Sequence, residues 1–322
     1  MKGTTKSWLL TAAVLLLAGG LVFAWAMSGL HWDFSALGTV QYVTNTAEVD
    51  ERVRNLSIRS DTAEIVFAPS EDGRCRVVFY EPENRRHTAS VEDGTLVIEE
   101  AEAGAWYEHI TLLSFATPKI TVCLPETDYA ALEIRGGTGS VSIPADFTFE
   151  RMDIAVSTGG ARCAASVSGP VRIKTGTGDI RLNDLSAGAL RLSVSTGAVE
   201  LRSVACAGDV ELTVSTGRAY LAEVSCKNLV SGGSTGDLVL EQVVVGEKMT
   251  LARSTGDLRL VQCDAAELEI QTGTGSVTGS LRSEKVFFAK SGTGRVEVPE
   301  TVSGGPCRVT TSTGDIRLEI QG

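Results

Sequence analysis

Four aspartates stand where a repeated corner could present carboxylates to a cation. Asp179, Asp237, Asp257 and Asp315 each follow a Thr-Gly pair, and calcium prefers six to eight oxygen ligands of this kind. The other six repeats carry different residues at this position, namely Ser140, Gly160, Ala198, Arg218, Ser276 and Arg295. Because arginine repels a cation, the row favours solvated corners, and we expect no metal site and no cofactor.

The sequence also gives little indication of a group of catalytic residues. Glycoside hydrolysis needs two carboxylates at a set separation, whereas Arg181 and Glu200 on adjacent repeats predict an ordinary surface ion pair. The three histidines all precede the repeats, at positions His31, His87 and His109. No Ser/His/Asp or Cys/His arrangement can be read from these spacings. We therefore predict no catalytic residue and a protein that is not an enzyme.

The chain contains seven cysteines. Cys163, Cys263 and Cys307 fall at apolar positions of the repeat, where cysteine acts as a small hydrophobe. Cys206 and Cys226 share a repeat position and would lie on adjacent rungs, although parallel side chains give poor disulfide torsions. No Cys/His spacing indicates zinc, so buried free thiols are expected.

One stretch departs from the regular pattern. Residues 91–118 include Trp106, Tyr107 and His109 in what the sequence predicts to be a long loop. Exposed aromatic residues on a loop can mark a recognition site. The alternative is that the loop folds its aromatic residues over the end of the β structure as a cap.

These residues are positioned by a repeat that occupies the last two-thirds of the chain. Ten glycines, each preceded by threonine, recur every 19 or 20 residues at Gly139, Gly159, Gly178, Gly197, Gly217, Gly236, Gly256, Gly275, Gly294 and Gly314. A fixed period in this range is typical of a solenoid. Glycine tolerates positive φ, so we interpret these ten residues as structural corners.

Apolar residues flank each corner with the period of a β-strand. They stand seven and five residues before the glycine, as at Leu190 and Leu192, and two and four residues after it, as at Val199 and Leu201. A third short segment in the middle coils is marked by Leu185, Val204, Val224, Val243 and Cys263. We therefore predict an all-β fold, a single-stranded and right-handed β-solenoid over 131–322, roughly 50 Å long. A propeller is disfavoured because even and odd repeats look alike.

The N-terminus carries a membrane signal. Residues 8–27 form an apolar run that follows Lys2 and Lys6, long enough to cross a bilayer. The positive-inside rule places residues 1–7 in the cytoplasm and the rest outside a cell membrane, as a single-pass protein. Cleavage after Ala24-Trp25-Ala26, giving a secreted protein, is the alternative.

The remaining segments are less regular. Residues 28–50 read as a polar linker, and residues 51–130 alternate like strands without Thr-Gly corners, which predicts irregular β rungs or an N-terminal cap. At the other end Ile316, Leu318 and Ile320 form a last strand with nothing after it to cover it. Self-association through this open C-terminal rung is one expectation, and simple hydration of a short strand is the other.

The net charge of the chain limits the classes of partner that it could bind. Lysine and arginine number 29 against 40 acidic residues, for a net charge of −11. Nucleic-acid binding requires a basic stripe, which this chain lacks. The expected partner is therefore an unknown protein or an envelope or surface polymer.

One phrase and the repeats resemble a known family. The phrase is ITVCLPETDYAALEIRGGTGSVSIP (120–144), and the units that follow read STGDI or GTGSV. Together with the N-terminal anchor they resemble the bacterial putative-adhesin β-strand-repeat proteins, a domain of unknown function, over residues 50–322. The resemblance implies a bacterial, surface-anchored, non-enzymatic protein that acts as an adhesin-like or cell-envelope interaction surface. The alternative is an accessory partner of an envelope-stress membrane signalling system.

Overall fold

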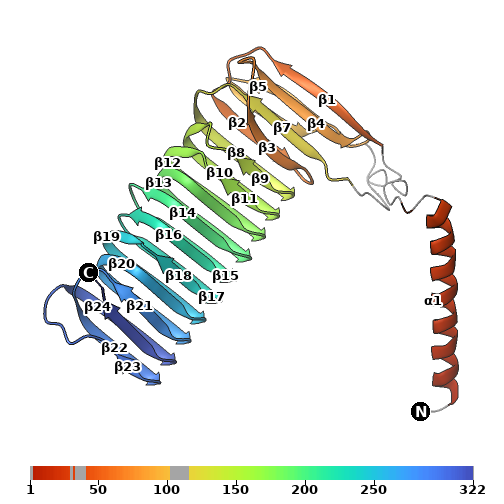
Figure 1. Cartoon of the computed structure of the whole chain (residues 1–322). Helices are drawn as coiled ribbons and strands as arrows, with labels where there is room; N and C mark the ends of the chain where they lie inside the picture. Colours follow the sequence, from red (N-terminus) through yellow and green to blue (C-terminus); the bar gives the residue numbers. More distant parts are fainter. Residues whose placement is uncertain (1–2, 30–31, 33–40, 102–115, 322) are drawn as a thin grey trace.

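A computed structural model of the chain describes residues 3–29, 32, 41–101 and 116–321 (Figure 1). A single helix, α1 (Gly3–Gly29), begins the described part, and all other regular structure there is β. The helix extends beyond the predicted residues 8–27 at both ends. Its segment Leu10–Gly29 is long and apolar enough to cross a membrane, as a signal sequence would also be.

Among its described residues, the irregular N-terminal region contains seven strands. They are β1 (Tyr42–Val49), β2 (Asn55–Ser60), β3 (Glu64–Pro69), β4 (Cys75–Pro82), β5 (His87–Glu92), β6 (Thr95–Glu100) and β7 (Lys119–Leu124). Strand β1 lies inside residues 28–50, which the sequence predicted to be a linker. This segment is a strand rather than a linker, since all eight of its residues, Tyr42–Val49, pair antiparallel with β4.

The regular region follows without interruption. Its strands are β8 (Asp128–Thr138), β9 (Val141–Ile143), β10 (Thr148–Thr158), β11 (Ala161–Cys163), β12 (Ser166–Thr177), β13 (Ile180–Thr196), β14 (Val199–Cys206), β15 (Val210–Thr216), β16 (Ala219–Cys226), β17 (Leu229–Thr235), β18 (Leu238–Glu241), β19 (Val244–Thr255), β20 (Leu258–Thr274), β21 (Val277–Leu281), β22 (Lys285–Thr293), β23 (Val296–Glu297), β24 (Gly305–Thr313) and β25 (Ile316–Ile320).

The strands stack as the rungs of a β-solenoid, which confirms the predicted fold class (Figure 1). Pairing between rungs is parallel and in register: Met152 in β10 lies between Leu132 of β8 and Val171 of β12, each one repeat away in the sequence. The strands after the corner pair in the same way, with β11 lying between β9 and β13.

One continuous hydrophobic core fills the coil. In the rung around Gly197, the residues Leu190, Leu192, Val199 and Leu201 are all at most 2% exposed. The third segment also points inward, since its five predicted residues are at most 5% exposed, namely Leu185, Val204, Val224, Val243 and Cys263. Full burial of such a side chain stabilises the fold by about 1.5–3 kcal/mol, so the stacked rows carry most of the stability.

The corner glycines are required for two physical reasons. All ten have φ between +124° and +154°, a region that residues with a side chain rarely enter. In addition, a Cβ at Gly256 would lie 2.2 Å from the carbonyl oxygen of Gly236 on the preceding rung. Consecutive corners therefore stack backbone on backbone, with no room for a side chain.

A second corner was not predicted. Six residues after the glycine, five middle coils place a non-glycine residue in the left-handed region, with φ between 50° and 55°: Asp184, Ser203, Glu223, Gln242 and Gln262. These residues turn the chain toward the third segment. Their types share no pattern, which is why the sequence did not mark this turn.

The N-terminal end of the solenoid is closed by antiparallel strands. Strands β2 and β3 stack on β8 and β9, and β6 and β7 stack beyond them. The final neighbours run the other way: β5 pairs antiparallel with β6, and β4 pairs antiparallel with both β7 and β1. The irregular rungs thus continue the solenoid and cap it.

At the C-terminal end the rungs do not follow chain order, which corrects the predicted open rung. Strands β24 and β25 lie between β20–β21 on one side and β22–β23 on the other. Ile316 and Leu318 are therefore buried, at 0% and 3% exposed. The outermost rung is instead formed by β22 and β23, which lie at the lower end in Figure 1.

Candidate interaction surface

The four corner aspartates have a backbone role that the sequence did not reveal. A carboxylate oxygen of each accepts the N–H of the equivalent residue on the adjacent rung, at 2.8–3.0 Å: Ala198 for Asp179, Asp257 for Asp237, Ser276 for Asp257, and Arg295 for Asp315. They tie rung to rung along the corner. Within the described residues, no group of three or more Asp, Glu, His or Cys side chains is arranged to hold a metal.

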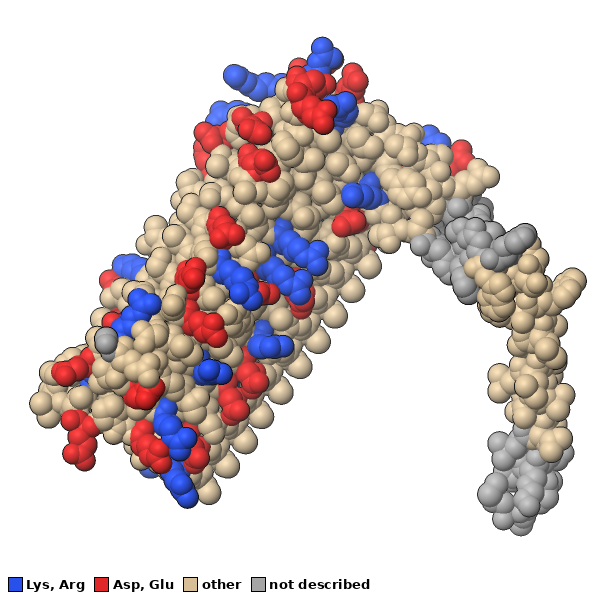
Figure 2. All heavy atoms as spheres, viewed as in Figure 1, with Lys and Arg blue, Asp and Glu red and all other residues tan. Residues whose placement is uncertain are grey.

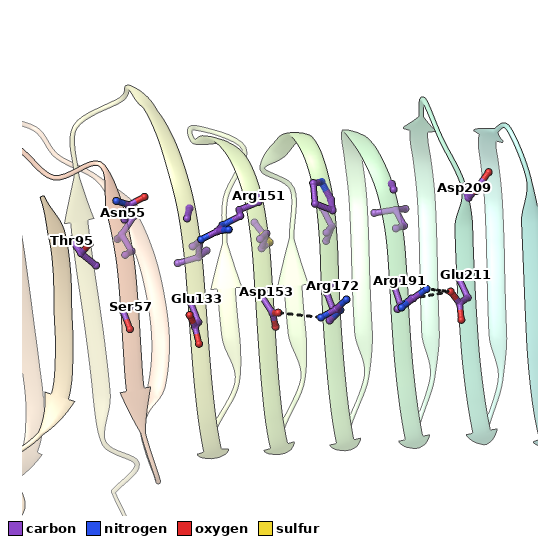
Figure 3. A pocket seen from close by; sticks show the side chains of 18 residues that line it. Asn55, Ser57, Thr95, Glu133, Arg151, Asp153, Arg172, Arg191, Asp209 and Glu211 are labelled. Carbon is purple, nitrogen blue, oxygen red and sulfur yellow. Dashed lines mark hydrogen bonds and ion pairs between the residues drawn. The ribbon is translucent and has the colours of Figure 1, made fainter. Parts of the chain in front are cut away.

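A side groove of about 830 Å³ runs across the outward face of the strands that precede the corners (Figure 3). It crosses β2, β8, β10, β12, β13 and β15, so its long axis follows the solenoid. We define the side groove by the charged residues Glu133, Arg151, Asp153, Arg172, Arg191 and Glu211. In-register stacking places five of these side chains in one row, one from each rung, and Arg151 lies beside the row on the same strand as Asp153, as Figure 3 shows.

The side groove carries charges of both signs, and its in-register row runs Glu133, Asp153, Arg172, Arg191 and Glu211. Arg172 Nη1 lies 3.8 Å from Asp153 Oδ2, and Arg191 Nη2 lies 2.7 Å from Glu211 Oε2. Both arginine side chains are about 60% exposed, so each pair contributes at most about 1 kcal/mol to stability. Among the described residues Arg151 has no ion pair. The guanidinium groups are thus available to an incoming ligand.

A second groove of about 790 Å³ crosses β2, β6, β8, β10 and β12 nearer the corners. Its lining includes the small residues Gly137 and Gly176 and the basic residues Arg59 and Lys174. Figure 2 shows positive and negative side chains interspersed along the visible face of the solenoid. The two grooves therefore present one extended, mixed-charge surface.

Ser60, His87 and Glu81 form a hydrogen-bonded array that spacing alone could not show. His87 Nε2 lies 3.0 Å from Ser60 Oγ, and His87 Nδ1 lies 2.8 Å from Glu81 Oε2. This order of contacts is also that of a nucleophile, base and orienting acid. However, Ser60 is 4% exposed and Glu81 1% exposed.

The Ser60 array is directed toward the core. By strand alternation Ser60 shares the inward face of β2 with Leu56 and Ile58, and it also borders the second groove at the end of this strand. Its hydroxyl also accepts the N–H of Ala63 at 3.3 Å, and the imidazole stacks on Phe79. The array therefore satisfies buried polar groups at the capped end, and its low exposure argues against a catalytic role.

All seven cysteines are free, and six of them are buried. Burial raises the pKa of Cys163, Cys226 and Cys307 to about 12. Because the thiolate is the reactive form, these side chains are inert at neutral pH. The aromatic residues Trp106 and Tyr107, with His109, lie outside the described residues, as does His31.

Comparison with known proteins identifies the family to which this fold corresponds. The model of the family described as Toastrack DUF4097 matches residues 53–215 and 207–322. Among curated proteins, none matches the chain.

Solved structures share the fold at low identity. A putative lipid binding protein from Parabacteroides distasonis is 14% identical, with a TM-score of 0.51, over 88% of this chain and 98% of its own. A putative adhesin from the same species is 11% identical, with a TM-score of 0.48, over 87% and 98%. A putative adhesin from Bacteroides fragilis is 13% identical, with a TM-score of 0.40, over 87% and 97%.

Proposed function

The chain belongs to the Toastrack DUF4097 family, and from this premise we propose that it is a non-enzymatic, membrane-anchored extracytoplasmic protein. In this proposal the side groove binds an envelope or surface polymer in an adhesin-like way. The alternating apolar rows hold the solenoid together, so the outward rows are free to vary and to recognise a ligand.

The side groove is the observation that carries the proposal. Six strands about 4.8 Å apart give it a length of roughly 25 Å, which suits several units of a linear polymer better than one small molecule. Arg151, Arg172 and Arg191 lie on three successive rungs; Arg172 and Arg191 are in register with each other, and Arg151 is two residues from that row. A polymer with regularly spaced anionic or hydroxyl groups would meet one donor per rung, and weak contacts would add along the chain.

Placement supports the same function. The apolar segment Leu10–Gly29 follows two lysines near the N-terminus, so an anchor with the solenoid outside the cell agrees with the positive-inside rule. Lack of a catalytic role is supported by the regular surface and by the inert thiols. The Ser60 array is buried, with Ser60 4% and Glu81 1% exposed.

Polymer binding can be tested with the full-length protein in detergent micelles. The variant Arg151→Glu/Arg172→Glu/Arg191→Glu should lose most binding to insoluble cell-wall material in a co-sedimentation assay. The matched control is Arg162→Glu/Arg218→Glu/Arg259→Glu, which makes the same charge change at exposed arginines outside the groove. Equal binding by both variants would refute the side groove as the site.

A second function has one supporting feature, which lies in the helix. In the described structure, a Cβ added at Gly19 or Gly20 would have no other atom within 4 Å, so this face of the helix is open. Small residues let membrane helices approach closely. A partner of an envelope-stress membrane protein could bind there. Crosslinking in native membranes distinguishes the two functions. Only the partner function predicts that another membrane protein is captured and that Gly19→Ile/Gly20→Ile abolishes this capture.

A further inference from the structure

The outermost C-terminal rung has a free edge. We define the terminal rung as residues 285–298, which include β22 and β23. Strand β22 pairs with β24, and β23 pairs with β25, and no further strand pairs with either of them among the described residues. A row of backbone N–H and C=O groups therefore faces away from the solenoid, and such edges are templates for another strand.

The end face of the terminal rung is apolar as well as unpaired. Among its inward residues Val296 is 42% exposed, and Phe287, Ala289 and Val298 are only partly buried. Phe288 is in register with Arg308 and points outward at the side. On the neighbouring rung the equivalent inward residues, Cys307, Val309 and Ile316, are fully buried. The difference arises because the terminal rung lacks a cover on its outer side.

The opposite end shows how this solenoid ends a stack. There a strand of reversed direction is the final neighbour, as β5 is for β6 and β1 is for β4. No large apolar side chain of β1 or β5 is among the exposed ones in the described structure. An antiparallel strand is thus a compatible final neighbour for a rung of this fold.

We propose that the terminal rung pairs antiparallel with the terminal rung of a second copy, which gives an end-to-end dimer with two-fold symmetry. Two identical rungs related by a two-fold axis meet in antiparallel order, and the contact is self-complementary. The dimer covers the apolar end faces of both copies at once and leaves the side grooves exposed.

The sequence of β22 favours one register for this pairing. With Phe287 opposite itself, Val286 lies opposite Phe288, and Glu284, which directly precedes β22, lies opposite Lys290. Lys290 has no ion pair among the described residues, and Glu284 accepts only the hydroxyl of Ser303 there. Each copy therefore supplies a cation and an anion to two identical cross-strand pairs, which favours a second copy over an unrelated strand.

The contact is small. A nine-residue strand spans roughly 30 Å and two facing sheets lie about 10 Å apart, so the buried area falls at the low end for specific complexes. We expect a dimer that forms at micromolar concentration. It would place the two N-terminal ends at opposite ends of one rod, a geometry that can join two surfaces.

Charge reversal tests the register and separates pairing from misfolding. Sedimentation of the full-length protein in detergent should show a concentration-dependent dimer. Lys290→Glu and Glu284→Lys should each weaken association at least tenfold, because like charges would then face each other. The double variant Lys290→Glu/Glu284→Lys should restore the dimer, which a folding defect would not do.

A crosslink tests the symmetry axis directly. Under mild oxidation Phe287→Cys should form a covalent dimer, because the two Cα atoms opposite each other lie within disulfide range. Ala289→Cys is the control, since its own copy lies about four residues away across the pair. Wild-type protein that stays monomeric at 100 µM would overturn the proposal, and so would equal crosslinking of both variants. A monomer whose terminal rung pairs only with a strand from a different protein would also contradict it.

Discussion

At Gly256 a side chain would meet the backbone of the neighbouring rung, whereas at Asp257 one hydrogen bond is at stake. The variant Gly256→Val combines an unfavourable positive φ, costing about 1–3 kcal/mol, with a Cβ only 2.2 Å from a carbonyl oxygen. Asp257→Ala loses the bond to the Ser276 amide at 2.8 Å, worth about 1 kcal/mol.

We expect Gly256→Val to lower the free energy of unfolding by several times the loss in Asp257→Ala. Urea denaturation followed by circular dichroism measures both. If the two variants unfold at the same urea concentration, the corner is not limited by backbone contact and our account of the repeat is wrong.

A buried ion pair near the terminal rung should make stability depend on pH. Burial would raise the pKa of Asp264, but hydrogen bonds from Lys285 and Ser283 outweigh it and hold the pKa below 3.8. Lys285 Nζ lies 2.8 Å from the carboxylate, and its side chain is 4% exposed. A carboxyl group with a lowered pKa stabilises the fold above its unfolded pKa, and this contribution is lost as pH falls through the folded value.

Asp264→Asn should therefore destabilise the protein by about 3 kcal/mol at pH 7, because Lys285 is left buried without its partner. The difference from wild type should shrink as the pH falls below 3.8. Denaturation series at several pH values measure this, with the exposed Asp237→Asn as the control. A difference that is constant with pH would contradict the ion-pair account.

At the scale of the element, one rung departs from the apolar rows. Arg253 is 4% exposed and points inward, where its guanidinium donates to Ser231 Oγ at 3.0 Å and to the carbonyl of Ala252 at 2.8 Å. Gly233 leaves space beside it, since a Cβ there would lie 3.1 Å from Nη1. Burial lowers the pKa of Arg253 to about 10, so it stays charged at neutral pH without a carboxylate partner.

Replacing this polar pair together should stabilise the solenoid. We expect Ser231→Ala/Arg253→Leu to raise the free energy of unfolding by about 1–3 kcal/mol, because a desolvated charge is exchanged for apolar packing. Arg253→Leu alone should gain less, since it leaves the Ser231 hydroxyl unpaired. A double variant that melts below wild type would show that the guanidinium stabilises the rung.

The repeat was predictable from the sequence, whereas its exceptions were not. Strands, the apolar rows and the corner glycines follow from period and side-chain type, because each rung meets the same neighbours. The left-handed turn at Gln242 and its counterparts uses residues of no common type. The position of the rung β24–β25 in the stack depends on which rungs it pairs with. The sequences of the neighbouring repeats are too similar to predict that choice.

The candidate surface was only partly foreseeable. The outward row that includes Arg181 and Glu200 was read as ordinary surface charge, and its members do form ion pairs. The side groove depends on a different outward row, in which Arg172 and Arg191 gain meaning only once the register aligns them. The buried array of Ser60, Glu81 and His87 joins three strands, and Ser60 is 27 residues from His87, so spacing in the sequence did not indicate the contact.

At the scale of the whole molecule, topology decides which partners the solenoid can reach. We expect protease added to intact cells or protoplasts to digest the chain beyond Ser28, because the lysines before the helix favour an N-terminus inside. Antibody to the C-terminal region then detects loss of the solenoid. Full protection of that region would contradict an extracytoplasmic solenoid. A product lacking residues 1–26 in untreated cells would indicate cleavage instead of anchoring.

The most direct test of a solenoid that acts through its side groove compares attachment of whole cells. Cells that display wild type, the Arg151→Glu/Arg172→Glu/Arg191→Glu variant or the Arg162→Glu/Arg218→Glu/Arg259→Glu control at equal surface levels are scored for attachment to immobilised envelope polymer. We predict that wild-type and control cells attach equally and that attachment by the groove variant falls at least tenfold. Equal attachment by all three would contradict the account.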